Sequence, residues 1–124
     1  DEAVAYAKQR KQFGRRLIDF EMVQAMLADM AIKTEAARVL VNNCMRQMDA
    51  GEMVRKDGAI VKTFVTDAMQ EVVSNAVQVL GGYGYSEEYP VEKLMRDAKI
   101  FQIFEGSNQI QRMTIAKELD REYR

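Results

Sequence analysis

The chain has 124 residues, a length that suits one domain built around a single hydrophobic core. Its 18 Lys and Arg residues are balanced by 19 Asp and Glu residues, and the net charge of −1 argues against a broad nucleic-acid-binding surface. The absence of histidine excludes His triads, His-containing zinc sites and Glu-x-x-His di-iron sites, while the single cysteine, Cys44, excludes an internal disulfide and a cysteine metal cluster. We therefore expect no metal site.

The first half of the chain predicts two helices. A short helix covers about residues 3–11 and stops near Gly14, and a connector then leads to Asp19. A long helix is expected from about Phe20 to Asp49, with Asp19 as its N-cap and Gly51 just beyond its end. Its apolar or small residues recur at alternating spacings of four and three, as in the seam of a helical bundle: Val23, Leu27, Met30, Thr34, Ala37, Val41, Cys44 and Met48.

The second half predicts one long and two shorter helices. The long helix runs from about Met53 to Leu80, and its internal Gly58, which costs roughly 1 kcal/mol relative to alanine, suggests a close helix contact. A short helix follows from about Pro90 to Lys99, and Ser107 caps a last helix. The stripe expected to be buried on the long helix is Val61, Val65, Ala68, Val72, Ala76 and Val79. On the last helix we expect Ile110, Met113, Ile115 and Leu119 inside and Gln109, Arg112 and Lys117 outside.

Together these elements predict an all-α fold, an up-down four-helix bundle with short flanking helices, forming one domain over residues 1–124. No apolar run of 18 residues and no signal peptide is present, so neither a membrane span nor a targeting signal is predicted. The chain begins at Asp1 without an initiator methionine and enters a helix almost at once. We therefore expect it to be a fragment of a longer protein.

Three segments carry residues that packing alone does not require. Residues 10–16 (RKQFGRR) form either a solvated basic helix end or a phosphate clamp, because Arg presents paired donors to phosphate oxygens. Residues 78–84 (QVLGGYG) form either a glycine helix stop or a place where a phosphate or planar ligand approaches the backbone. Residues 103–109 (IFEGSNQ) form either a surface turn before the Ser107 cap or a site where Glu105, desolvated beside Ile103 and Phe104, acts as a general base.

These segments, in this order, resemble the C-terminal helical domain of the acyl-CoA dehydrogenases. The matching stretches are residues 10–14, 78–84, 88–99 (EYPVEKLMRDAK) and 102–112 (QIFEGSNQIQR), and the resemblance covers essentially the whole chain. It implies a flavoprotein that oxidises an acyl-CoA thioester to the trans-2-enoyl-CoA and passes electrons to an electron-transferring flavoprotein. Glu105, in its IFEG segment, falls at the catalytic-base position of the short- and medium-chain type members. In isovaleryl- and long-chain-type relatives the base lies on an earlier helix.

The resemblance also implies how the site works. Glu105 would remove the α-proton of the thioester while the β-hydrogen moves as hydride to flavin N5, and the backbone N–H of Glu105 would help to polarise the thioester carbonyl. Gly106 would leave room for the substrate beside the base.

For FAD, the resemblance implies a site shared between subunits. Arg10 matches the arginine that reaches the FAD pyrophosphate of a neighbouring subunit, with Gln12 and Phe13 at adjoining contact positions. Gln78 and Gly82 match contacts to the adenosine side across the dimer, and Gly81 is grouped with them as cofactor-binding. Ser107 and Gln109 match contacts to the subunit's own FAD. Many relatives have Gln where this chain has Glu21, whose carboxylate would disfavour a nearby phosphate, so Glu21 is not assigned as a ligand.

The expected parent is a three-domain homodimer or homotetramer that binds neither nucleic acid nor membrane. It would be cytoplasmic in a bacterium or in the mitochondrial matrix of a eukaryote. The fragment alone is expected to be inactive. Two alternatives remain open: a flavin-dependent enoyl-CoA or acryloyl-CoA reductase that runs the reaction in reverse, and a non-catalytic helical oligomerisation module.

Overall fold

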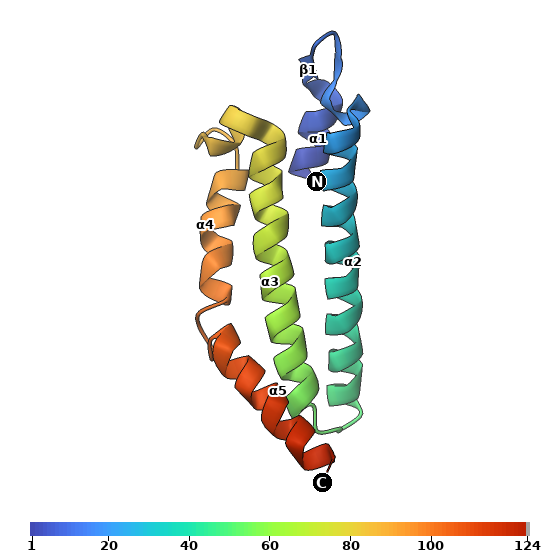
Figure 1. Cartoon of the computed structure of the whole chain (residues 1–124), viewed down its shortest axis with the longest axis vertical. Helices are drawn as coiled ribbons and strands as arrows, with labels where there is room; N and C mark the ends of the chain where they lie inside the picture. The colour runs from blue at the N-terminus through green and yellow to red at the C-terminus, as the bar shows by residue number, and fades with distance from the viewer. Residues whose placement is uncertain (124) are drawn as a thin grey trace.

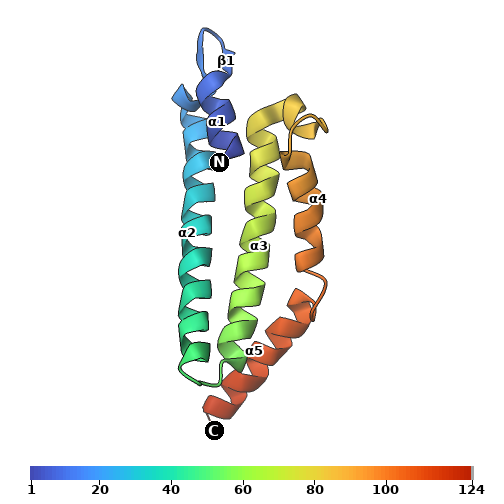
Figure 2. The same ribbon diagram turned by 180° about the vertical axis from the view of Figure 1, so that it is seen from behind.

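The computed structural model describes residues 1–123 as a set of helices along one long axis (Figure 1). The elements in chain order are α1 (Glu2–Gln9), β1 (Lys11–Gln12), β2 (Arg15–Arg16), the 3₁₀ helix η1 (Leu17–Asp19), α2 (Glu21–Asp49), α3 (Arg55–Leu80), the 3₁₀ helix η2 (Gly81–Tyr85), α4 (Val91–Phe101) and α5 (Asn108–Glu122). Helices α2 and α3 run in opposite directions, and α4 followed by α5 returns along another side of α3 (Figure 1, Figure 2). The all-α, up-down bundle expected from the sequence is confirmed.

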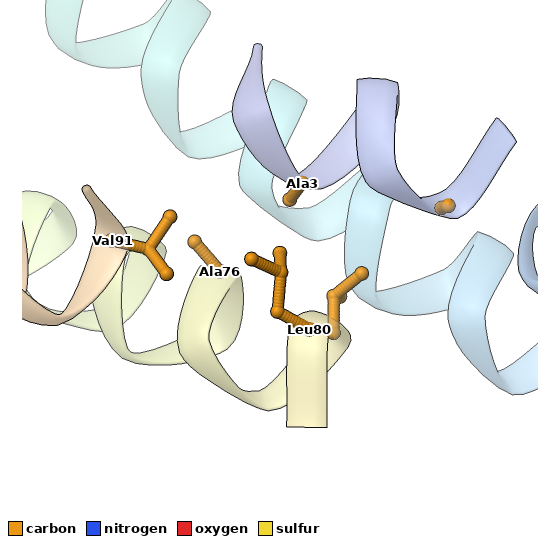
Figure 3. Packing of buried hydrophobic residues seen from close by; sticks show 6 residues of the cluster. Ala3, Ala76, Leu80 and Val91 are labelled. Atoms are coloured by element: carbon orange, nitrogen blue, oxygen red, sulfur yellow. The ribbon is translucent and has the colours of Figure 1, made fainter. Parts of the chain in front are cut away.

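The most deeply buried part of the core lies where α1, the end of α3 and the start of α4 meet (Figure 3). Because alanine side chains are short, Ala3 and Ala7 let α1 lie close against α3. They lie opposite Leu80 at the end of α3 and Val91 at the start of α4. This packing fixes α1, and with it the hairpin that follows, beside η2. The buried cluster consists of Ala3, Ala7, Ala76, Val79, Leu80 and Val91.

The turn between α2 and α3 follows the helix-stop chemistry expected at Gly51. Gly51 has φ +78°, its N–H donates to the carbonyl of Met48, and the N–H of Glu52 donates to the carbonyl of Gln47, both at 3.0 Å. This pair of hydrogen bonds is a Schellman motif, which requires a left-handed residue after the helix and therefore favours glycine.

The two predicted stripes of the long helices lie largely inward. All six α3 positions are buried or half-buried, and so are six of the eight α2 positions, while Thr34 and Met48 are exposed. A strict seven-residue repeat drifts by about 20° per heptad around a straight helix, so towards the end of α2 Gln47 turns inward in place of Met48. No helix within residues 1–123 combines the length and the apolar character needed to cross a membrane.

Three local predictions were wrong. Helix α1 ends at Gln9, and Gly14 lies in a hairpin turn instead of stopping the helix. Phe20 occupies the N-cap of α2, because the Asp19 carboxylate accepts two hydrogen bonds from the Arg16 guanidinium, at 3.0 and 2.7 Å. No atom of another element lies within 4 Å of a Cβ built on Gly58, so this glycine marks no close helix contact.

The predicted inner face of the last helix was also largely wrong. Ile110, Met113 and Leu119 are 51%, 55% and 42% exposed, and only Ile115 of the four is half-buried. The physical reason is that α3 offers charged partners to α5, so that polar residues of α5 face it. Gln109, Arg112 and Lys117 are exposed as expected, and Arg112 pairs from this exposed position with Asp67 of α3 at 2.7 Å. Two further pairs fasten the other end of α5, Arg55–Glu118 and Lys56–Glu122.

Candidate functional site

The first candidate segment folds as a β-hairpin beyond the end of α1. Its two-residue turn consists of Phe13 with φ +52° and Gly14 with φ +80°, and two consecutive positive φ values are what a type I′ turn requires. Asparagine commonly fills the first of these positions, whereas a bulky residue there is an outlier. Phe13 is 93% exposed, and its ring lies 6.5 Å from that of Phe20. The hairpin thus exposes the Phe13 ring to solvent and holds the Phe13 backbone in a left-handed conformation that is unfavourable for phenylalanine.

The arginines of this segment have different partners. Arg15 stacks over the Phe20 ring at 4.0 Å and Arg16 pairs with Asp19, so both fasten the hairpin to the start of α2. Arg10 has its guanidinium 5.4 Å from the centre of the Tyr83 ring, and none of the ion pairs found within residues 1–123 involves it. Arg10 is therefore the arginine of this segment whose charge is available to a ligand.

Arg10 opens onto a groove of about 670 Å³ between the hairpin and the end of α3. Four of the predicted cofactor-binding residues line it together: Arg10, Gln12, Gly81 and Gly82. Apolar and aromatic side chains make up much of the remaining lining, with Glu88 at one side. Gln78 lies exposed on the last turn of α3, next to the groove but outside its lining, and Phe13 projects from the hairpin tip. A cation beside an apolar, aromatic wall suits a ligand with an anionic and a planar part.

The glycines at the end of α3 have separate reasons to be glycine. Gly81 has φ +63° and ψ −137°, a conformation that only glycine adopts readily. A Cβ on Gly84 would lie 2.5 Å from the carbonyl oxygen of Val77, so this position tolerates no side chain. Gly82 has neither constraint, because its φ lies outside the left-handed region and nothing lies within 4 Å of its Cβ direction. Helix termination therefore explains Gly81 but leaves Gly82 as open backbone on the groove wall.

Three tyrosines form one wall behind Arg10. The rings of Tyr6, Tyr83 and Tyr89 lie 5.8 to 6.3 Å from one another, at tilted or edge-on angles. Burial raises the pKa of Tyr6, and the positive charge of Arg10 opposes part of this rise. The phenol therefore stays neutral at physiological pH, so Arg10 gains no tyrosinate counter-ion there.

Glu105 lies in the bend between α4 and α5. Its φ is +54°, and Gly106 after it has φ +83°, so two consecutive residues are left-handed. The side-chain amide of Gln111 donates to the carbonyl of Glu105 at 3.0 Å and to that of Gly106 at 3.3 Å. The Glu105 side chain is exposed on the described chain, and its backbone N–H donates to no atom of residues 1–123. The bend therefore presents a carboxylate and an open N–H donor together.

Ser107 begins α5 as expected, and its hydroxyl accepts the N–H of Ile110 at 3.4 Å. Ser107 and Gln109 line a cleft of about 420 Å³ together with Asp67, Lys99 and Arg112. Two cations and one carboxylate thus face this cleft, next to the Glu105 bend. The structure places both predicted residues here, away from the Arg10 groove.

The candidate residues therefore form two groups at different heights along α3. The bend around Glu105 is attached at Asp67, and the groove is lined by residues 79–82, which follow Asp67 by 12 to 15 positions and lie about 20 Å further along the axis of α3. The sequence indicated the members of both groups but neither the hairpin nor the polar contacts that hold the bend. These contacts come from Asp67, Asn108 and Gln111, and no sequence pattern marks them, because Asp67 is one of several charged α3 residues that meet α5, with Lys56 and Lys62.

The bundle thus carries a groove lined by Arg10 at one end and an exposed carboxylate in a strained bend beside α3. The family model "Acyl-CoA dehydrogenase, C-terminal domain" matches residues 1–119. The chain belongs to the acyl-CoA dehydrogenase family, whose members are flavin-dependent.

Relatives of both reaction directions are similar to this chain. The caffeyl-CoA reductase-Etf complex subunit CarC of Acetobacterium woodii is 46% identical over 94% of the chain and 31% of its own length. The solved butyryl-CoA dehydrogenase of Megasphaera elsdenii is 47% identical with a TM-score of 0.93, over 95% of the chain and 31% of its own. A structure of an FAD complex of PigA is 27% identical with a TM-score of 0.92, over 97% of the chain and 31% of its own. The chain thus spans about a third of the length of the curated relatives it matches.

Proposed function

We propose that this chain is the C-terminal domain of a three-domain, FAD-dependent acyl-CoA dehydrogenase of the short- and medium-chain type, in which Glu105 is the catalytic base. The observation that carries the proposal is the bend itself. A non-glycine residue is held left-handed, its carboxylate is exposed, and its own N–H has no acceptor within residues 1–123. Strained backbone of this kind clusters at functional sites.

In the proposed reaction the two groups of Glu105 act on the same thioester. The backbone N–H donates to the carbonyl oxygen and thereby stabilises the negative charge that develops when the α-proton leaves. The carboxylate takes that proton, and the electrons of the broken α C–H bond form the new double bond. A flavin held beside this bend would supply the redox chemistry, as the acceptor of the β-hydrogen and its electron pair. The Cβ direction of Gly106 gives the acyl chain no room, because it meets the Gln111 side-chain amide at 2.7 Å; this contact and φ +83° account for the glycine.

The residues of the groove fit FAD in their chemistry. The Arg10 guanidinium carries donors in a fork that matches phosphate oxygens, and it is not paired with a carboxylate within residues 1–123. Gly82 offers backbone with open space before it, and Gln12 lies on the same wall. Phe13 and Gln78 beside the groove are positioned for further contacts, and Ser107 and Gln109 would contact FAD from the Glu105 side.

We further propose that each FAD is shared between two copies of the protein. The separation of about 20 Å along α3 between the groove and the bend supports an arrangement in which Arg10 serves a neighbouring subunit's FAD while Glu105 serves its own. The parent would then be a homodimer or homotetramer that takes an acyl-CoA and delivers electrons to an electron-transferring flavoprotein. The isolated chain, which spans about a third of its relatives, would not turn over.

The test is the Glu105→Gln variant of the full-length protein. We expect it to lose exchange of the substrate α-proton with deuterated solvent while the visible flavin absorption is retained, because the amide cannot accept the proton. Glu87→Gln, another exposed glutamate, is the matched control and should exchange normally. Normal exchange in Glu105→Gln would remove this residue from its role.

The reductase direction is the second candidate, because the caffeyl-CoA reductase-Etf complex subunit is as similar to this chain as the butyryl-CoA dehydrogenase. The same carboxylic acid and the same flavin serve both directions, so the chain itself does not distinguish them. Comparing acyl-CoA oxidation by a dye acceptor with enoyl-CoA reduction by a reduced electron donor, in the full-length protein, decides between them.

A further inference from the structure

One carboxylate on α3 holds both ends of the bend that carries Glu105. The loop closes where the N–H of Asn108 donates to the carbonyl of Gln102 at 3.0 Å. The side-chain amides of Gln102 and Asn108 both donate to the same oxygen of Asp67, Oδ1, each at 2.7 Å. The other oxygen, Oδ2, accepts from Arg112 at 2.7 Å. Asp67 therefore connects the residue before the loop, the residue after it and the first turns of α5.

A second layer of contacts holds Asn108. This side chain is 3% exposed, its Oδ1 accepts from the Lys62 ammonium at 2.6 Å, and its amide also donates to Thr66 Oγ1 at 2.8 Å. A buried amide with partners on both its oxygen and its nitrogen has one fixed orientation. The end of the loop is therefore fixed in position relative to α3.

The loop needs such support because its backbone is strained. Glu105 is one of two non-glycine residues with positive φ in the part of the chain described, and conformations of this kind persist only where the surroundings enforce them. Gln111 holds the carbonyls of Glu105 and Gly106, and Asp67 fixes the two ends between which they lie. Released from Asp67, the loop would relax towards ordinary backbone conformations, and the carboxylate would leave its place.

We propose that Asp67 is a positioning residue for Glu105: by accepting hydrogen bonds from Gln102 and Asn108, it holds the loop in the conformation that aims the Glu105 carboxylate and N–H at one substrate. This inference rests on the proposed function for its catalytic consequence. Burial of Asp67 raises its pKa, but the hydrogen bonds from Arg112, Gln102 and Asn108 outweigh burial and lower the pKa overall. The carboxyl group is accordingly ionised at neutral pH, as three donors require.

The first test is hydrogen exchange of the loop amides in the full-length protein carrying Asp67→Asn. The variant keeps the shape of the side chain but turns an NH₂ group towards donors. We expect peptides covering residues 102–108 to exchange about tenfold faster, while peptides from the middle of α2 are unchanged. Glu71→Gln is the matched control, because Glu71 lies one turn further along α3 and does not contact the loop. It loses an ion pair with Lys33 at 2.8 Å, similar in length to the Arg112–Asp67 pair at 2.7 Å. Equal loop exchange in Asp67→Asn and Glu71→Gln would overturn the proposal.

The second test separates positioning from simple stability. Misplacing a catalytic group by about 1 Å costs as much as a hundredfold, so we expect kcat of Asp67→Asn to fall about ten- to a hundredfold while KM changes little and FAD is retained. Gln111→Met, which removes the donor to the Glu105 and Gly106 carbonyls but leaves Asp67 intact, should lower kcat in the same way. An unchanged kcat in a variant whose loop has become mobile would refute the positioning role.

Failure of the proposed function and failure of the Asp67 proposal give different results. If Glu105→Gln still exchanges the α-proton, Glu105 is not the base. Loop exchange in Asp67→Asn still reports whether Asp67 holds the bend, because it is measured without turnover.

Discussion

Two glycines that lie two residues apart, Gly82 and Gly84, should respond oppositely to the same substitution. In Gly84→Ala the new Cβ would lie 2.5 Å from the carbonyl oxygen of Val77, 3.0 Å from the Cα of Val77 and 2.9 Å from the Cβ of Leu80. Two of these atoms are backbone, so no side-chain rotation relieves the overlap. Overpacking costs about 1–3 kcal/mol, and we expect the upper end, about 3 kcal/mol. For a domain of this size that is a fall in Tm of about 10 °C.

Gly82→Ala should leave the fold intact, because nothing lies within 4 Å of the added methyl group and φ is outside the left-handed region. Since alanine also restricts the unfolded chain, the free energy of unfolding should stay the same or rise by up to about 1 kcal/mol. The methyl group would instead protrude into the groove beside Arg10 and weaken FAD retention in the full-length protein. Urea unfolding and flavin release measure the two effects. Equal destabilisation by both substitutions would refute the assignment of Gly84 to packing and Gly82 to ligand approach.

Three further predictions follow from single positions. Gly58→Ala should raise the free energy of unfolding, measured by urea titration, by about 1 kcal/mol, because Gly58 lies within a helix and nothing lies within 4 Å of an added Cβ. A lower free energy of unfolding would contradict this open space around Gly58. Phe13→Asn should leave thermal stability unchanged or higher, because asparagine fits the left-handed turn at least as well as phenylalanine. FAD should dissociate faster from this variant, because the exposed ring is lost. Unchanged FAD dissociation would remove Phe13 from the site. Because hydrogen bonding lowers the pKa of Asp67 below 3.8 in the folded state, its carboxylate contributes full stability above about pH 4 and loses it as the pH falls through the folded pKa. Wild-type protein should therefore lose more stability on acidification below pH 4 than Asp67→Asn, and parallel losses would contradict the network.

Local signals were enough wherever one residue and its immediate neighbours decide the structure. Gly51 ends α2 through a Schellman motif, and Ser107 begins α5 as a hydroxyl cap. Both features depend on backbone groups within a single turn, so sequence reasoning reaches them. Asp19 shows the limit, since a good N-cap residue was recruited by Arg16, and the competing partner belonged to a hairpin that the sequence did not predict.

Periodicity predicts that a face is buried but does not name the surface that buries it. Ile110, Met113 and Leu119 have the spacing of an inner helix face, yet within this chain they remain largely exposed and the polar side of α5 contacts α3. The stripe of α3 was predicted correctly because α3 has neighbours on several sides, α1, α2, α4 and α5, so that nearly every apolar position finds a partner. The prediction for α5 was therefore wrong because it assumed that α3 packs against the apolar face of α5, whereas α3 contacts the polar face.

The residues that hold the bend were beyond sequence reasoning for a different physical reason. Glu105 belongs to a short, recognisable sequence motif, in which a carboxylate stands directly before a glycine. Asp67 lies 38 positions earlier, and its significance arises only when α3, α4 and α5 bring Gln102, Asn108 and Arg112 to its two oxygens. The motif points to the group proposed to react, whereas the strained backbone at Glu105 requires support, and only the packed structure shows that this support converges on one carboxylate, that of Asp67.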